Sequence, residues 1–323
     1  MKKEVKTTIT NKAHEKTPGN PSVSISSDQK LNDRSNRKPL RVLSEEDWKF
    51  WMHNGYIVIK NAIPKEQAKA TANFIWEFDD KDPNDTSTWY AKPRAEMKMK
   101  ELAGTGMVEA YNHQSLWNNR QMQKVYDTFV DVWGTEKLWV TIDRVNLNFP
   151  QRPGEEKEGF IHWDYDPETR PQNVQGVIAL ADQMDESMGG FQCVPWLYRN
   201  YHTWKLTQPE DRNRFQPNLD SLQDKLVKVL MEAGDLLIFN STEPHGIRPN
   251  RSGEKVRIAQ YISMMPAEEE NQELKDWRIN SWKNRIAPVG YAFPGDPRNW
   301  EQKKHKTAEL TKLGKKLLGL DNW

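Results

Sequence analysis

A histidine and an aspartate stand two residues apart in the stretch "GFIHWDYDPE" at residues 159–168. In an extended strand, side chains two apart share a face, so His162 and Asp164 would point one way while Trp163 and Tyr165 point the other. An imidazole and a carboxylate on one face can both bind a transition metal. Such a pair also arises by chance in a chain of this composition, and an ion pair at a strand edge is the structural alternative. The pair alone therefore does not identify a metal site.

A second segment, "GDLLIFNSTEPHG" at residues 234–246, supplies a further histidine. Its apolar run predicts a strand that ends near His245. Two histidines and one carboxylate, with coordination positions left open, form the facial ligand set of non-haem Fe(II) sites that activate dioxygen. We therefore predict His162, Asp164 and His245 as metal ligands and catalytic residues, if the fold brings the two segments together.

At these residues the sequence resembles the phytanoyl-CoA dioxygenase superfamily of iron(II)/2-oxoglutarate oxygenases. The resemblance runs from about residue 44 to residue 265 and rests on four segments in order: "WMHNGYIVIKNAIP", the His-x-Asp of "HWD", "ADQMDESMGGFQCVP" and "GDLLIFNSTEPHGIRPNRSGEKVR". It implies a mainly β fold with flanking helices, a double-stranded β-helix (jelly roll, cupin-like). It also implies Fe(II), the cosubstrate 2-oxoglutarate and O2 as cofactors.

The resemblance further implies a strand arginine that binds the far carboxylate of 2-oxoglutarate, and Arg257 stands twelve residues after His245. Alternation in "KVRIAQYIS" puts Arg257 on the same face as Ala259, which is small enough to leave room for a ligand. A planar guanidinium suits bidentate capture of a carboxylate. The alternative is a solvated arginine at a strand end, and we expect that role for Arg248 and Arg251.

The sequence departs from the family pattern at two places. Many members follow the proline of the Gly-Gly segment with a Gly-Ser-His turn, where this chain has Trp196, Leu197 and Tyr198. Many also carry a hydroxyl residue two positions after the distal histidine, where this chain has Ile247. We expect Ser252 to take the place of that hydroxyl in cosubstrate binding.

Several polar residues are candidates to line the interior of the barrel. Arg144 and Asn146 share a face of one predicted strand and are assigned to substrate, while Gln175 on the next strand is assigned to the cosubstrate. A polar outer face of the sheet is the alternative. His113 borders the pocket on the family pattern, and Trp163 lies between two predicted ligands, so both are further candidates for substrate contact.

The elements that would position these residues can be read from apolar segments and turn signals. Ser44 and Asp47 form a capping-box signature, which predicts a helix that ends at Gly55. A strand over 56–60 and a helix over 64–78 follow. Six apolar segments separated by Pro, Gly and Asn predict an antiparallel barrel or double-sheet jelly roll, with strands at 138–149, 160–166, 174–182, 190–196, 235–240 and 255–265. Further helices are expected at 219–233, 268–282 and 301–318.

Composition divides the chain into two parts. Residues 1–42 hold ten Lys or Arg against four acidic residues and few large apolar side chains, which predicts a flexible basic tail that is dispensable for chemistry. Residues 43–323 are predicted to form a single oxygenase domain, with a jelly-roll core at about 138–265 and a helical extension at 268–323. One cysteine, Cys193, excludes an intrachain disulfide and is typical of a reducing compartment, so we predict a cytoplasmic location.

These features predict an oxygenase that hydroxylates, desaturates or cyclises a small metabolite while 2-oxoglutarate and O2 become succinate and CO2. We expect a small-molecule substrate and no obligate protein partner. No apolar run approaches the ~20 residues that span a bilayer, and the body after the tail is mildly acidic, so neither a membrane nor nucleic acid is expected. Two alternatives stay open. One is a cupin-like protein that binds a metal or ligand without turnover; the other is a nucleic-acid repair dioxygenase, whose Arg-x-Asn-x-Thr-x-Arg signature is absent.

Overall fold

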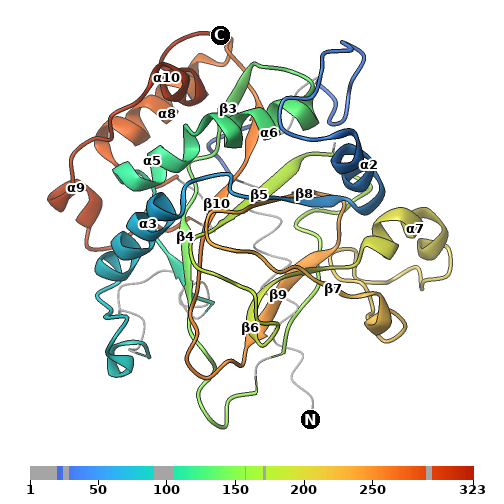
Figure 1. Cartoon of the computed structure of the whole chain (residues 1–323). Coiled ribbons are helices and arrows are strands. Elements are labelled where there is room, and N and C mark those ends of the chain that lie inside the picture. Colours follow the sequence, from blue (N-terminus) through green and yellow to red (C-terminus); the bar gives the residue numbers. More distant parts are fainter. Residues whose placement is uncertain (1–19, 25–28, 91–104, 157, 170–171, 289–292) are drawn as a thin grey trace.

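Two antiparallel sheets form the centre of the molecule (Figure 1), in a computed structural model that describes residues 20–24, 29–90, 105–156, 158–169, 172–288 and 293–323. The larger sheet has six strands, in the order β1 (Tyr56–Ile59), β8 (Leu236–Asn240), β5 (Val174–Ala179), β10 (Arg257–Ile262), β4 (Val145–Asn148) and β2 (Met107–Val108). The smaller sheet has three, in the order β7 (Val227–Lys228), β6 (Met188–Cys193) and β9 (His245–Asn250). A separate pair joins β11 (Met264–Pro266) to β3 (Leu138–Val140).

The larger sheet is apolar on both faces because both are covered. Val177, Leu237 and Ala259 face the smaller sheet, where they pack with Phe191 and Cys193. Residues on the opposite face join the largest apolar cluster, which the helices complete: Ile178, Leu236, Ile238, Ile258 and Ile262. Burial on both sides explains why segments such as "LLIF" read as continuous apolar runs rather than as alternating ones. The arrangement confirms the predicted double-stranded β-helix with flanking helices.

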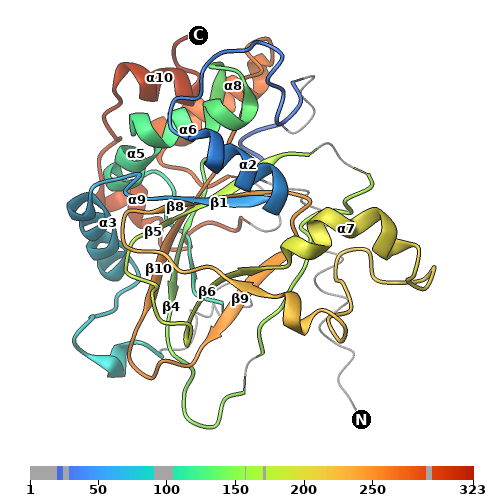
Figure 2. The same ribbon diagram turned by 45° about the vertical axis from the view of Figure 1, so that its right-hand side comes forward.

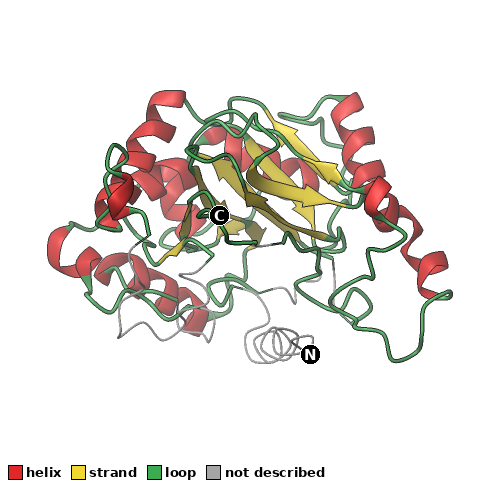
Figure 3. Cartoon of the chain, turned by 90° about the horizontal axis from the view of Figure 1, so that it is seen from below, coloured by secondary structure: helices red, strands yellow, loops and turns green. Residues whose placement is uncertain are grey.

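Most helices lie over the outer face of the larger sheet (Figure 2): α3 (Lys65–Phe78), α5 (Gln114–Arg120), α6 (Gln123–Trp133), α8 (Gln272–Asn284), α9 (Trp300–Lys304) and α10 (Lys312–Leu318). The helix α7 (Pro195–Lys205) lies on the side of the smaller sheet, with α2 (Glu45–Asn54) between it and β1. Seen from below, the strands occupy the space between two groups of helices (Figure 3). Within the described ranges, no helix has both the length and the apolar character to cross a membrane.

Several predicted elements are confirmed with small changes of boundary. At α2, the Ser44 hydroxyl accepts from the Asp47 N–H, the Asp47 carboxylate accepts from the Ser44 N–H, and Gly55 ends the helix at φ 72°. The next strand and helix form as β1 and α3. Four of the six apolar segments form β5, β6, β8 and β10, each shorter than predicted, and β11 continues the last of them.

Four predicted elements are wrong. Residues 160–166 form only an isolated bridge, because the His162 N–H donates to His245 O while the Trp163 N–H donates to Phe215 O in a different segment. Residues 219–233 are not a helix but contain a 3-10 turn (Gln223–Lys225) and β7, since pairing with β6 outweighs the local helical pattern. The 138–149 segment divides into β3 and β4, and the 301–318 segment into α9 and α10. The helices α5, α6 and α7 and the strand β9 were not anticipated.

The described part of the N-terminal segment packs on the body. Leu31 is buried in the main apolar cluster, and the Ser22 hydroxyl accepts from the Ile142 N–H at 2.8 Å. The Trp51 indole N–H donates to Asn32 Oδ1 at 2.7 Å. Described residues of the predicted flexible tail thus make buried contacts with the body that the polar composition of this segment does not reveal. Residues 1–19 and 25–28 lie outside the described residues.

One buried arginine joins this segment to the rest of the chain. The fully buried Arg278 of α8 donates to the main-chain oxygens of Val140, Leu317 and Leu318 at 2.8–2.9 Å and also to that of Ser22. Its guanidinium thus connects the N-terminal segment, the strand β3 and the C-terminal helix α10.

Candidate metal centre

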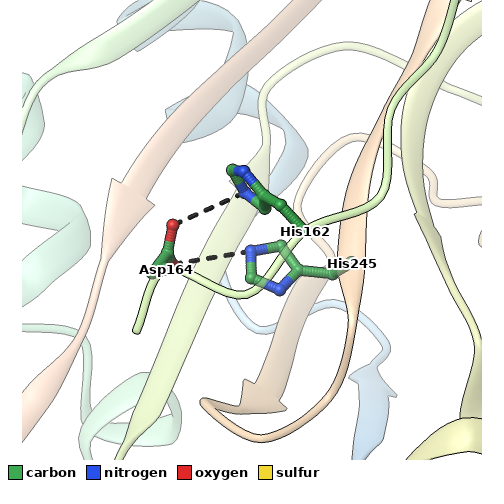
Figure 4. A group of neighbouring side chains, drawn as sticks. All are labelled: His162, Asp164 and His245. Carbon is green, nitrogen blue, oxygen red and sulfur yellow. Dashed lines mark ion pairs between the residues drawn. The ribbon is translucent and has the colours of Figure 1, made fainter. Parts of the chain in front are cut away.

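The three predicted ligands converge at one end of the space between the sheets (Figure 4). His162 and Asp164 lie on the segment between β4 and β5, and His245 begins β9. One candidate ligand atom from each lies within 4.8 Å of the others. Asp164 Oδ1 is 3.5 Å from His162 Nε2, and Asp164 Oδ2 is 3.6 Å from His245 Nε2. Divalent transition-metal ions bind N and O ligands at about 2.0–2.2 Å, so ligand atoms around one ion lie roughly 3–4 Å apart. The spacing fits one ion.

Groups behind the ligands orient them. His245 Nδ1 is 2.9 Å from the main-chain oxygen of Glu243, so Nδ1–H donates there and the lone pair of Nε2 faces the cluster. The His245 ring packs against Phe239, with ring centroids 4.4 Å apart. The Gln175 amide donates to Asp164 Oδ2 at 2.6 Å. Gln175, predicted as a cosubstrate contact, thus contacts a candidate metal ligand.

Arg257 begins β10, next to Asn148 of β4, and is fully buried. Its Nη1–H donates to Asn146 Oδ1 at 2.7 Å and its Nε–H to Gln183 Oε1 at 3.2 Å. Nη2 has no hydrogen-bond partner among the described residues. A buried cation held only by neutral groups is unfavourable, and an anionic ligand would complete it. The residues present therefore fit both the metal and an acidic cosubstrate.

The predicted solvent exposure of Arg248 is wrong. A solvated arginine at a strand end was predicted here, but the Arg248 side chain is buried. It donates to the main-chain oxygens of Phe191 and Gly189, each at 2.5 Å. Burial, and next the charge of Arg257, lower the pKa of Arg248 to about 10. Gln183 connects the two arginines: its Oε1 accepts from Arg257 and lies, like Arg248 Nη2, beside Gly190. No pattern in the sequence indicates this proximity.

The remaining polar candidates on the β4 segment are both buried. Arg144 pairs with Glu109 at 3.2 Å, and its guanidinium lies 4.3 Å from the centre of the Phe293 ring. Asn146 binds Arg257 through its oxygen and donates to Thr105 O at 3.0 Å. Asn146 thus belongs to the Arg257 site, whereas the charge of Arg144 is matched by a carboxylate.

Three predicted site residues make contacts within the fold. His113 caps α5 and stacks on Phe74, with ring centroids 3.7 Å apart. Trp163 is fully buried in the cluster beneath α7, and its indole N–H donates to Thr242 O at 2.9 Å. Ser252 donates to Asn250 Oδ1 at 2.7 Å within the turn after β9. Each polar group already has a local partner.

Comparison with known proteins agrees with this geometry. Residues 51–259 match the family model described as phytanoyl-CoA dioxygenase (PhyH). The chain is 25% identical over 246 residues to the Ava biosynthesis cluster protein O of Aspergillus versicolor, covering 68% of this chain and 77% of that protein.

Two solved structures share the fold. GlcNAc Inducible Gene 2, GIG2, of Candida albicans superposes with a TM-score of 0.60 at 14% identity, over 97% of this chain and 82% of that one. A hypothetical protein of Escherichia coli gives a TM-score of 0.59 at 14% identity, over 88% and 87%. The family match spans all three candidate ligands and Arg257, and this chain belongs to the phytanoyl-CoA dioxygenase (PhyH) family, whose members use Fe(II), 2-oxoglutarate and O2.

Proposed function

We propose that His162, Asp164 and His245 hold Fe(II), that Arg257 binds the far carboxylate of 2-oxoglutarate, and that the protein hydroxylates, desaturates or cyclises a small metabolite. The family match supports a 2-oxoglutarate oxygenase. The observation that carries the proposal is the combination of a His-Asp-His cluster with a fully buried arginine whose Nη2 has no hydrogen-bond partner in the part of the chain that the structure describes. Fe(II) with 2-oxoglutarate supplies the oxidation of a C–H bond by O2, with succinate and CO2 as co-products.

The protein's own residues hold and orient the reactants. The imidazoles of His162 and His245 and the carboxylate of Asp164 would hold Fe(II), and such a three-ligand set would leave coordination positions for the cosubstrate and O2. Gln175 holds Asp164 Oδ2, which fixes the carboxylate plane. Loss of a hydrogen bond to a metal-binding side chain typically lowers metal affinity by about 10- to 100-fold.

Arg257 would position the cosubstrate. Asn146 and Gln183 each accept one of its N–H groups, so the guanidinium is already oriented before a ligand arrives. Its unpaired Nη2 leaves a donor for a carboxylate, and charge-assisted hydrogen bonds of this kind are stronger where water is excluded. This preorganisation favours an acidic cosubstrate over a neutral one.

A small metabolite is the substrate class that the surroundings of the cluster support. The Phe160 side chain is 40% exposed, and its ring centroid lies 5.0 Å from that of His162, which offers an apolar contact beside the ligands. The half-buried Gln175 and Tyr261 add polar groups nearby on the strands. The name of the Aspergillus relative assigns that protein to a biosynthesis cluster, which supports a metabolite rather than a macromolecule.

The test is a titration of the anaerobic Fe(II) protein with 2-oxoglutarate, followed by its visible charge-transfer band. Truncation of one partner of a buried, hydrogen-bonded charge pair typically weakens binding by about 2–5 kcal/mol. Arg257→Ala should therefore raise the half-saturating concentration by roughly 30-fold or more, since 1.4 kcal/mol corresponds to tenfold. Arg257→Lys should recover only part of the affinity, because an ammonium lacks the planar fork.

Arg251→Ala, at an exposed position in the turn after β9, is the matched control and should leave the titration unchanged. An Arg257→Ala curve that overlies the wild-type curve would contradict the assignment. Release of succinate from 2-oxoglutarate in the presence of O2 separates an oxygenase from a protein that binds the same ligands without turnover.

A further inference from the structure

A second buried guanidinium lies beside Arg257 with no acidic partner. Neither Arg248 nor Arg257 forms an ion pair with any of the residues described, although their side chains are 4% and 0% exposed. Arg248 Nη1 and Nη2 are bound by two main-chain oxygens, and Arg257 by two side-chain amides. The charge of Glu186 acts on Arg248, but this carboxylate is exposed and pairs with Lys228 at 2.7 Å, so no acidic side chain of the described residues contacts either guanidinium.

Gln183 and Gly190 bring the two guanidinium groups together. Gln183, which is fully buried, accepts from Arg257 Nε–H through Oε1. A Cβ added at Gly190 would lie 3.1 Å from Arg248 Nη2 and 3.2 Å from Gln183 Oε1. Gly190 also has φ of +107°, a conformation that a side chain disfavours. Because Gly190 has no side chain, the side chains of Arg248 and Gln183 can both lie against it.

Three donors in this group have no partner among the described residues: Arg248 Nε, Arg257 Nη2 and Gln183 Nε2. Buried polar groups are normally hydrogen-bonded, and three unpaired donors from adjacent side chains indicate a missing acceptor. A carboxylate has two oxygens with about four acceptor positions in total, so one carboxylate can satisfy all three donors. It would also lower the repulsion between two like charges in a medium of low dielectric constant.

We propose that Arg248, Arg257 and Gln183 form one preformed site for the terminal carboxylate of a short aliphatic dicarboxylate, in which Arg248 is a second determinant of cosubstrate specificity. The identity of that dicarboxylate as 2-oxoglutarate rests on the proposed function. The site itself does not require the metal, because none of its donors belongs to the His-Asp-His cluster. It should accept a dicarboxylate that lacks the 2-oxo group.

Glutarate is the probe, because it has the length of 2-oxoglutarate without the 2-oxo oxygen. Calorimetric titration of the full-length anaerobic Fe(II) protein should show saturable binding of glutarate, and binding should persist after the metal is removed by a chelator. Uncharged glutaramide, of the same length, should not bind. Absence of glutarate binding by the wild-type protein in both states would overturn the proposal, while the charge-transfer titration above still tests the metal and 2-oxoglutarate separately.

Two single substitutions measure how much each arginine contributes to glutarate binding. Arg248→Met and Arg257→Met should each weaken glutarate binding by about tenfold or more, as expected for the loss of a charge-assisted hydrogen bond. Arg251→Met is the matched control and should bind like the wild type. A folded Arg248→Met protein with wild-type glutarate affinity would show that Arg248 only supports the main chain at Gly189 and Phe191, and would overturn the proposal.

Gln183→Glu is a second test, because this substitution is expected to stabilise the ligand-free protein. It does not depend on whether the Arg248→Met protein folds. The substitution is nearly isosteric and places an internal carboxylate between the two guanidinium groups. It should raise the melting temperature of the ligand-free protein and weaken glutarate binding by at least about tenfold. The gain in melting temperature should shrink when Arg248→Met is added. A Gln183→Glu protein that melts lower than the wild type and still binds glutarate would exclude an excess of positive charge at this site.

Discussion

His162 and His245 are joined to each other through their main chains. The His162 N–H donates to His245 O at 2.7 Å, and the His245 N–H donates to His162 O at 2.9 Å. These two bonds form an isolated bridge that places both imidazoles beside Asp164. The candidate metal centre is therefore assembled by a pairing between distant segments of the chain and not by a continuous strand.

Substitution of the cluster should abolish metal binding while the fold is kept. His162→Ala, Asp164→Ala and His245→Ala each remove one of three ligands. We expect Fe(II) affinity to fall by about 100-fold or more, beyond the effect of losing a residue that only hydrogen-bonds to a ligand. Anaerobic calorimetry with Fe(II) measures this, with circular dichroism to verify the fold. His202→Ala is the control, because His202 lies on α7 and is not part of the cluster. Metal affinity that falls equally in the control would argue against the assignment.

Gln175 should act through Asp164. Gln175→Met keeps the size of the side chain but removes the donor to Asp164 Oδ2, so Fe(II) affinity should fall by about tenfold with little change in melting temperature. Gln172→Met serves as the control, since Gln172 is exposed and its amide oxygen accepts from Asn240 instead. Unchanged metal affinity in Gln175→Met would leave Gln175 with no role in orienting the ligand.

The N-terminal segment should contribute to stability from residue 20 onward. A chain that begins at residue 43 loses the buried Leu31, the Asn32–Trp51 bond and the acceptor that Ser22 provides to Arg278. Burial of one leucine contributes about 1.5–3 kcal/mol, and each buried hydrogen bond about 1 kcal/mol. We therefore expect the free energy of unfolding to fall on the order of 5 kcal/mol.

Urea denaturation of chains that begin at residue 20 and at residue 43 measures this difference directly. The longer chain retains all the described contacts of the segment and serves as the reference. Equal unfolding midpoints for the two chains would restore the original expectation of a dispensable tail up to residue 42.

His113 should make the protein less stable in mild acid. Burial, and next the charge of His305, lower the pKa of His113 to about 4, whereas histidine in an unfolded chain titrates near 6.5. Between these values the unfolded chain binds a proton that the folded protein does not, so stability falls as the pH decreases from about 6.5 to about 4. Glu301 opposes this trend, because burial raises its pKa to about 7 and the folded protein takes up a proton there first.

The variant His113→Asn isolates the histidine, because asparagine can still cap α5. Unfolding free energies measured from pH 7 to pH 4 should fall less in the variant than in the wild type, by about 1 kcal/mol after allowance for solvent screening. Parallel curves for the two proteins would contradict a depressed pKa of His113.

The amino-acid sequence by itself determined the features that depend on local chemistry. Residue type and spacing made His162, Asp164 and His245 candidate ligands, and the family resemblance together with strand alternation made Arg257 the candidate carboxylate partner. Ser44, Asp47 and Gly55 specify both ends of α2, because a capping box and a left-handed glycine act within one or two turns. Apolar runs likewise located β5, β8 and β10, since strands buried on both faces need apolar residues at successive positions.

Only the tertiary structure decided the features that depend on distant partners. Residues 219–233 have a helical pattern but pair with β6, and residues 20–42 have a polar composition but contribute Leu31 to the core. Arg248 was predicted to be a solvated residue at a strand end. It is buried near Arg257 because Gly190 and Gln183, from other segments of the chain, pack beside it. Local periodicity reports which side chains share a face, whereas burial and charge pairing depend on which surfaces the whole chain brings together.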